Sequence, residues 1–237
     1  AAKCHHSFHL QPGQTFEVWT TSCIVTNFPG NDILVNPCNS DLSGVSKLPY
    51  FPRGGPVPPK PPTTMHKDWQ PLGYISSWGN MDVKNGIVFP HSVVDGLVHE
   101  HGGWRLRLEC QWKAPSPVGT SVRTSAGALR DYSCVLHTTP PFFRGRCDET
   151  LLLLQSCYHS VLDSATMSGV HDVPRVAIPL LGAGARGFEP AEAIEVAVSS
   201  CVNWFVQNPT KRAILVFGLL ERGNAELLVQ DISRITS

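Results

Sequence analysis

The chain lacks an excess of charge of either sign. Its 237 residues carry 19 Lys and Arg against 19 Asp and Glu, so the formal net charge at pH 7 is zero. Because proteins that bind nucleic acid usually present a broad positive surface, this charge balance argues against a nucleic-acid partner. A small anion can still be bound by backbone dipoles, which need no net positive charge.

Long apolar runs and paired cysteine motifs are also missing. No run of about 18 apolar residues occurs, so we expect no membrane span and no membrane partner. No N-terminal signal peptide is visible. None of the cysteines has C-x-x-C spacing, which favours reduced, buried thiols in an intracellular protein, cytoplasmic or nuclear, over a disulfide framework. The eight cysteines are residues 4, 23, 38, 110, 134, 147, 157 and 201.

The sequence also lacks Cys and His residues at the spacing of a known metal-binding motif. Cys4-His5-His6 and His99-Glu-His101 each bring candidate ligands together. Neither spacing matches a zinc signature, so we expect no metal site.

The most informative feature that is present is a glycine-rich segment, Gly182-Ala-Gly-Ala-Arg-Gly-Phe188. It follows the apolar run 175–181 and precedes Pro190 and an amphipathic stretch, which predicts a strand, a loop and a helix. Such a loop can turn backbone N–H groups inward beside the positive end of a helix dipole, which predicts a phosphate site. The alternative is a turn that only lets strand and helix pack closely.

The same segment matches the dinucleotide motif G-x-G-x-x-G through Gly182, Gly184 and Gly187. In dinucleotide-binding folds this motif belongs to the first βαβ unit, with an acidic residue about 20 positions later. Here the motif lies near the C-terminus, and residues 202–204 are Val, Asn and Trp. The sequence therefore disfavours a hydride-transfer enzyme.

Strand and helix patterns alternate along the chain, which predicts an α/β sandwich with helices on both faces of the sheet. We expect one domain over 1–237, with an N-terminal extension at about 1–14 and a Pro-rich insertion at about 46–89. Asp148 is expected to cap the helix 148–168, and Gly102-Gly103 to end the helix 92–101. Strands are predicted at 15–20, 33–35, 120–124, 132–138, 173–181 and 213–217, and further helices from Pro190 and over 221–235.

Residues 46–65 contain seven prolines, which no packed strand or helix can accommodate. This composition predicts a surface insertion, partly in the polyproline II conformation. The alternative is a docking peptide for an SH3-like partner, because Pro56-Val-Pro-Pro59 and Pro59-Lys-Pro-Pro62 both satisfy P-x-x-P.

Two polar residues sit where strands and helices are expected to begin or end. Asn39 follows the short apolar strand 33–35, where it can cap the next segment or hydrogen-bond a ligand hydroxyl. Asp95 lies at a helix start, where it can cap the helix or orient a water beside a bound phosphosugar. His99, one turn later, is interpreted as a partly buried core histidine.

The order of these segments resembles the macro domain, the ADP-ribose-binding module. Ile33-Leu-Val-Asn-Pro-Cys-Asn39 resembles the family's strand ending in N-A-A-N, and Val94-Asp-Gly-Leu-Val-His99 resembles V-D-G-x-I-H. Residues 120–138 are similar to T-x-G-x-L-x-x-x-x-V-I-H-T, and residues 178–188 to P-x-I-S-T-G-x-Y-G-F. The resemblance covers about 16–235, most of the chain.

The resemblance implies a three-layer α/β/α sandwich with a central mixed sheet and ADP-ribose in a cleft at the strand ends. It implies hydrolysis of mono-ADP-ribosyl esters on acidic protein side chains, or of O-acetyl-ADP-ribose, by a monomer that needs no cofactor. Asn39 and Asp95 would be catalytic: Asn39 would bind the distal ribose, and Asp95 would act near the attacked anomeric carbon. The implied ligand-binding residues are Cys23, Ile24, Asn39, Val94, Asp95, Gly96, Gly182, Ala183, Gly184, Ala185, Arg186, Gly187, Phe188 and Phe217.

The chain departs from the family pattern at several positions. The family's glycine run before V-D-G is replaced by residues 90–93, after an insertion. Arg186 stands where the family has an aromatic residue; a guanidinium can cover a ribose or pair with phosphate. The family's adenine-binding aspartate aligns with Ser22 or Cys23, and the adenine-packing residue with Phe217 or Leu219. A non-catalytic ADP-ribose reader and an unrelated nucleotide-binding α/β protein therefore stay open as alternatives.

Overall fold

The computed structural model describes residues 1–42, 48–49, 81–82, 87–88, 94–143, 146–184 and 186–236. Most of the Pro-rich insertion expected at 46–89, with both P-x-x-P segments, lies outside these residues, as do residues 90–93 and Ala185. Within 43–93 the structure describes three short strands that pair antiparallel in the order β4-β6-β5. They are β4 (Leu48–Pro49), β5 (Met81–Asp82) and β6 (Ile87–Val88).

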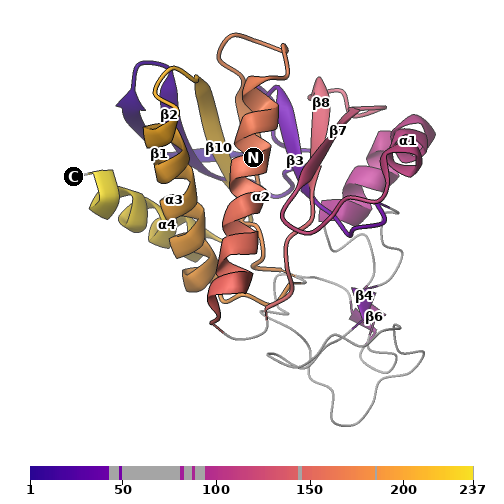
Figure 1. Cartoon of the computed structure of the whole chain (residues 1–237). Helices are drawn as coiled ribbons and strands as arrows, with labels where there is room; N and C mark the ends of the chain where they lie inside the picture. Colours follow the sequence, from indigo (N-terminus) through magenta and orange to yellow (C-terminus); the bar gives the residue numbers. More distant parts are fainter. Residues whose placement is uncertain are drawn as a thin grey trace.

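A seven-stranded mixed sheet forms the centre of the fold, in the order β1-β2-β10-β9-β3-β8-β7 (Figure 1). The strands from β2 to β8 in this order run parallel, and the edge strands β1 and β7 run antiparallel to their neighbours. The bounds are β1 (Lys3–Gln11), β2 (Gln14–Thr20), β3 (Ile33–Pro37), β7 (Ser121–Ser125), β8 (Cys134–Thr138), β9 (Arg175–Ile178) and β10 (Ala213–Leu219).

Strand β1 covers much of the segment at about 1–14 that the sequence predicts to be an N-terminal extension. It forms a hairpin with β2, and Phe8 pairs with Phe16 in the register. The tight turn requires Gly13, whose φ is +82°. Three histidines and a cysteine in β1 hide the alternation that marks a half-buried strand.

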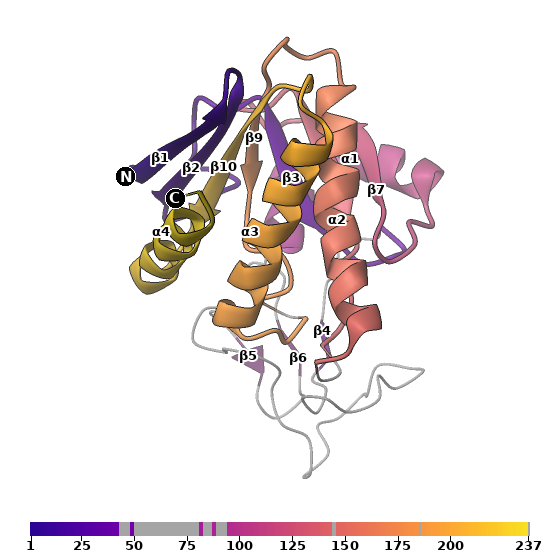
Figure 2. The same cartoon turned by 60° about the vertical axis from the view of Figure 1, so that its left-hand side comes forward.

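Helices cover both faces of the sheet, as Figures 1 and 2 show from two sides. Side chains of one strand alternate between the faces: Ile33 and Val35 pack in the cluster with α2, α3 and α4, whereas Leu34 packs in the cluster with α1. This arrangement confirms the predicted three-layer sandwich. The helices are α1 (Val94–Lys113), α2 (Asp148–Thr166), α3 (Pro190–Gln207) and α4 (Arg222–Thr236).

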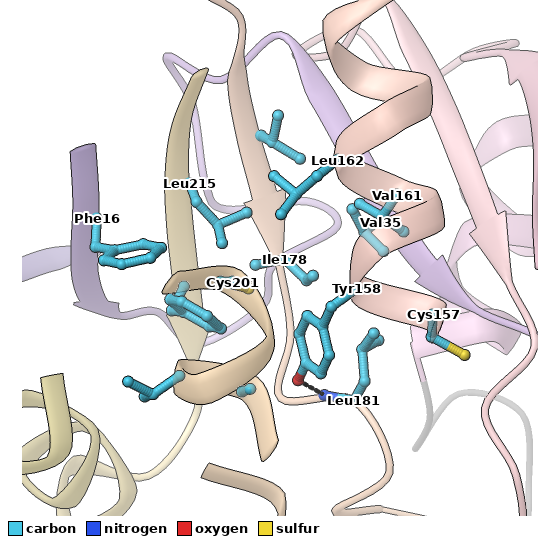
Figure 3. Packing of buried hydrophobic residues seen from close by; sticks show 14 of the residues in the cluster. Phe16, Val35, Cys157, Tyr158, Val161, Leu162, Ile178, Leu181, Cys201 and Leu215 are labelled. Carbon is cyan, nitrogen blue, oxygen red and sulfur yellow. Dashed lines mark hydrogen bonds between the residues drawn. The ribbon is translucent and has the colours of Figure 1, made fainter. Parts of the chain in front are cut away.

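The larger core cluster lies between the sheet and α2 and α3 (Figure 3). Tyr158 of α2 is fully buried there, and its hydroxyl accepts a hydrogen bond of 3.1 Å from the Leu181 N–H. Leu181 directly precedes the glycine-rich loop. The core therefore fixes the point at which that loop leaves the sheet.

Of the two helix boundaries predicted from sequence, one is confirmed and one is wrong. Gly102-Gly103 ends the first helical segment as predicted, because Gly103 has the non-helical angles φ +74° and ψ −168°; a second helical segment follows within α1 and continues to Lys113. At this break Ala128 donates its N–H to the Gly102 carbonyl at 2.9 Å. Asp148 is not the cap of α2 because Cys147 holds that position without a side-chain hydrogen bond, and Asp148 lies in the first turn.

Two expectations from composition are tested by the described residues. In this part of the chain no helix is long and apolar enough to cross a bilayer. All eight cysteines are free thiols. Five of them are buried as expected, but Cys4 and Cys147 are exposed and Cys23 is half-buried.

Candidate functional site

The polar segments singled out in sequence gather at the carboxyl-terminal edge of the parallel strands. The glycine-rich loop follows β9, Asn39 follows β3, and Cys23 follows β2. Since β2, β10, β9 and β3 run parallel, these segments lie at the same edge, where open α/β sheets bind ligands. Asn39 is half-buried.

Asp95 joins this edge from the first turn of α1, with Val94 before it and Gly96 after it. Asp95 is 5% exposed, and its Oδ1 accepts a hydrogen bond of 2.8 Å from Asn36 Nδ2. The positive end of the helix dipole favours a carboxylate there. Asp95 is thus held against β3 as well as near the N-terminus of α1.

Asn36 is a residue that the sequence analysis did not select. It is completely buried, and the same Nδ2 that donates to Asp95 lies 3.0 Å from His137 Nδ1. Because an amide nitrogen only donates, His137 Nδ1 accepts, and the His137 proton lies on Nε2, 2.9 Å from Thr124 Oγ1. Burial lowers the pKa of His137 to about 3, which keeps the ring neutral. A chain of buried hydrogen bonds therefore runs from β7 to Asp95.

The N-A-A-N and V-I-H-T likenesses could have indicated this chain of hydrogen bonds, because Asn36 and His137 belong to those motif segments. Neither was selected because a polar residue inside an apolar strand gives no sign of the partner it will meet.

His99 lies one helical turn after Asp95, with its Nε2 3.5 Å from Asp95 Oδ1. It is 5% exposed, and burial lowers its pKa although Asp95 acts in the opposite direction. The prediction of a core histidine is confirmed, and the core it belongs to borders Asp95.

His99, Cys110 and His137 form a group whose candidate metal-binding atoms lie within 4.8 Å of one another. Both ring nitrogens of His137 already take part in the hydrogen bonds described above. Burial raises the pKa of Cys110 to about 12, so without a bound ion its thiol is protonated. We interpret the group as part of the polar network that supports Asp95.

The glycine-rich loop is held by bonds at its two ends. Phe188 donates its N–H to the Gly182 carbonyl at 3.0 Å, and Gly187 donates to Gly184 at 3.1 Å. Gly182 and Gly187 have φ near +85°, a region that favours glycine. Four N–H groups of the loop make no hydrogen bond to another described residue: those of Gly182, Ala183, Gly184 and Arg186.

The helix that follows the loop differs from the expectation in one respect. Glu189 and Glu192 form a capping box at the start of α3, with Pro190 in the first turn. Their carboxylates already occupy the positive end of this helix dipole. An anion in the loop must therefore rely on other donors than the α3 N-terminus.

Arg186 reaches from the loop toward β3. Its Nη2 donates to the Cys38 carbonyl at 2.7 Å, and its guanidinium carbon lies 4.3 Å from the centroid of the Phe142 ring. Burial lowers the pKa of Arg186, an effect that the Cys38 thiol and Asp95 oppose. Burial also raises the pKa of Cys38 to about 12.

The remaining predicted ligand residues divide into two groups. Cys23 is half-buried and Ile24 is 6% exposed in the turn after β2, where the Tyr132 hydroxyl donates to the Ile24 carbonyl. Phe217, by contrast, is 1% exposed in the middle of β10 and packs near Phe16 in the core. The contact of Phe217 with a ligand stays a prediction, and its ring is packed in the core.

Comparison with known proteins agrees with this geometry. The family model for the macro domain matches residues 83–197. A macro domain-containing protein of Ralstonia nicotianae is 30% identical over 118 residues, which cover 50% of this chain and 67% of that protein. The chain belongs to the macro domain family.

Two further relatives and one solved structure extend this result. An O-acetyl-ADP-ribose deacetylase of Cronobacter turicensis is 29% identical over 51% of this chain and 69% of its own. A protein of Thermoplasma volcanium is 31% identical, and the match spans 48% of this chain but only 62% of that protein. An Oceanobacillus iheyensis macrodomain mutant with ADPR has a TM-score of 0.65 at 18% identity, covering 99% of this chain and 98% of its own.

Proposed function

We propose that the chain binds ADP-ribose at the carboxyl edge of its sheet and hydrolyses mono-ADP-ribosyl esters on acidic side chains, or O-acetyl-ADP-ribose. The observation that carries the proposal is the convergence of Asn39, Asp95 and the glycine-rich loop at this one edge. The solved relative with ADPR and the relative named as a deacetylase support both halves of it.

In the proposed complex the four available N–H groups of the loop receive the diphosphate, and Asn39 hydrogen-bonds the distal ribose. Together they place the anomeric carbon beside Asp95, which reduces the entropy that the reaction must lose.

For a mono-ADP-ribosyl ester, whose acyl oxygen is bonded to the anomeric carbon, the chemical step is the attack of water on that carbon. The water oxygen forms a bond to that carbon while the carbon–oxygen bond to the acyl group breaks, and the leaving carboxylate keeps the electron pair. Asp95 orients the water and accepts its proton. Asn36 holds the carboxylate in place through its hydrogen bond to Oδ1.

A non-catalytic ADP-ribose reader is the second candidate. The observation that favours it is the burial of Asp95, which is 5% exposed and already engages Asn36.

Turnover of a mono-ADP-ribosylated protein separates the two candidates. We expect the wild-type chain to release ADP-ribose, and Asp95→Ala to bind ADP-ribose but to turn over at least about 100-fold more slowly. In water labelled with oxygen-18, the released acid should carry no label, because attack occurs at the anomeric carbon. Label in the acid would show attack at the acyl carbon, and equal rates for Asp95→Ala and wild type would remove Asp95 from the chemistry.

A further inference from the structure

Arg186 connects three segments of the candidate site. Its backbone is fixed on both sides: its carbonyl accepts the Phe143 N–H at 2.7 Å, and Gly187 turns the chain directly after it. Its guanidinium meets the Cys38 carbonyl and the Phe142 ring. One side chain thus joins the glycine-rich loop, the segment after β8, and the turn that carries Asn39.

The charge of this guanidinium is incompletely balanced. Within the described residues the guanidinium contacts the Cys38 carbonyl and the face of the Phe142 ring, and no carboxylate lies at salt-bridge distance. A guanidinium has five N–H donors, and Arg186 is half-buried, so a charge there without a paired anion carries a desolvation cost. The environment therefore favours the arrival of an anion.

The neighbouring groups indicate where that anion lies. Four loop N–H groups, Arg186's own among them, have no hydrogen-bond partner in the described segments, and they belong to the loop from which the guanidinium extends. The carboxylates of Glu189 and Glu192 lie at the N-terminus of α3, so the dipole of this helix contributes little positive potential at the loop. Among the cations that the structure describes, Arg186 is best placed to supply positive charge, because its side chain extends from the loop itself.

We propose that Arg186 is an anion clamp that pairs with the ligand's diphosphate and, through the Cys38 carbonyl, links the occupied loop to the turn of Asn39. A planar guanidinium can donate two parallel hydrogen bonds to one phosphate while a third donor keeps the carbonyl contact. Cys38 directly precedes Asn39, so the same side chain couples diphosphate binding to the position of the ribose-binding amide. This inference rests on the proposed function and assigns the source of its affinity and charge selectivity.

The test compares Arg186→Lys and Arg186→Gln in the full chain, by calorimetric titration with ADP-ribose. Arg186→Gln can still donate to the Cys38 carbonyl but has no charge, and we expect its affinity to fall about 10- to 100-fold. Arg186→Lys keeps the charge but loses the paired geometry, so we expect a smaller loss, about 3- to 10-fold. Arg234→Ala, which removes an exposed arginine near the end of α4, is the control for net charge and should bind as wild type does.

Inorganic pyrophosphate separates a clamp from a structural brace. A clamp predicts that pyrophosphate competes with ADP-ribose in the wild type and in Arg186→Lys, and competes at least about 10-fold more weakly in Arg186→Gln. If Arg186→Gln binds ADP-ribose and pyrophosphate as the wild type does, the clamp is refuted while ADP-ribose binding stands. If the wild type itself fails to bind ADP-ribose, the proposed function fails first.

Discussion

Asn36→Leu tests whether the buried polar chain positions the catalytic carboxylate. The substitution replaces the amide with an apolar side chain of similar size, and it removes the 2.8 Å hydrogen bond to Asp95 and the 3.0 Å contact with His137. A hydrogen bond to a charged group is worth about 1.5–3 kcal/mol, and a neutral one about 1 kcal/mol. We therefore expect the free energy of unfolding to fall by about 2–4 kcal/mol, which lowers the melting temperature by roughly 4–16 °C.

The functional result should be selective, because Asn36 is completely buried and touches no ligand surface. We expect ADP-ribose affinity to stay within about threefold of wild type, while turnover falls about 10- to 100-fold as Asp95 loses its fixed orientation. The assays are thermal unfolding, calorimetric titration and release of ADP-ribose from a modified protein.

Asn31→Leu is the matched control. Asn31 is also buried and donates to the Phe28 carbonyl at 3.0 Å, but it lies just before β3, at the opposite edge of the sheet. It should lose about 1 kcal/mol of stability and keep its turnover rate. Equal turnover in the two variants would refute a positioning role for Asn36.

Three further predictions concern Gly182 of the glycine-rich loop, Tyr158, which binds the residue before that loop, and the buried His137. Gly182→Ala should lower the free energy of unfolding by about 2–4 kcal/mol and weaken ADP-ribose binding, because φ is +85° and a new Cβ would lie 2.9 Å from Phe188. The control is Gly223→Ala in α4, where nothing lies within 4 Å; in chemical denaturation it should not lower the free energy of unfolding and should raise it by up to about 1 kcal/mol. Tyr158→Phe should cost about 1–2 kcal/mol in the same assay, since the Leu181 N–H loses its partner, and an unchanged midpoint would contradict that bond. The pKa of His137 is lowered from 6.5 to about 3, so between these pH values the unfolded chain binds a proton there that the folded chain does not. The free energy of unfolding therefore falls as the pH drops from 6.5 toward 3, by about 2 kcal/mol at pH 5. His137→Gln should remove this part of the difference in stability between pH 7 and pH 5.

Local patterns were sufficient to predict the layers of the fold. The apolar strand at 33–35 and the helical spacing after Pro190 both gave elements of the expected type, because burial and backbone geometry act over a few residues. Strand β1 escaped detection because its exposed edge position tolerates polar residues on both faces. The Gly102-Gly103 pair indicated the break in α1, but not the second helical segment that follows it and continues to Lys113.

The site shows the same division between local and distant causes. The edge on which Asn39, Asp95 and the glycine-rich loop meet followed from motif order. The partner of Asp95 did not, because Asn36 is 59 positions away and is selected by the packing of α1 on β3. The neighbours of Arg186 likewise come from the separate segments after β3 and β8.

The central claim is that ADP-ribose binds at the carboxyl edge of the sheet, and calorimetric titration of the full chain with ADP-ribose tests it most directly. The account predicts saturable one-to-one binding with a dissociation constant in the micromolar range, weakened at least about 10-fold by Asn39→Ala. No heat of binding at millimolar ADP-ribose, or equal affinity in Asn39→Ala, would contradict it.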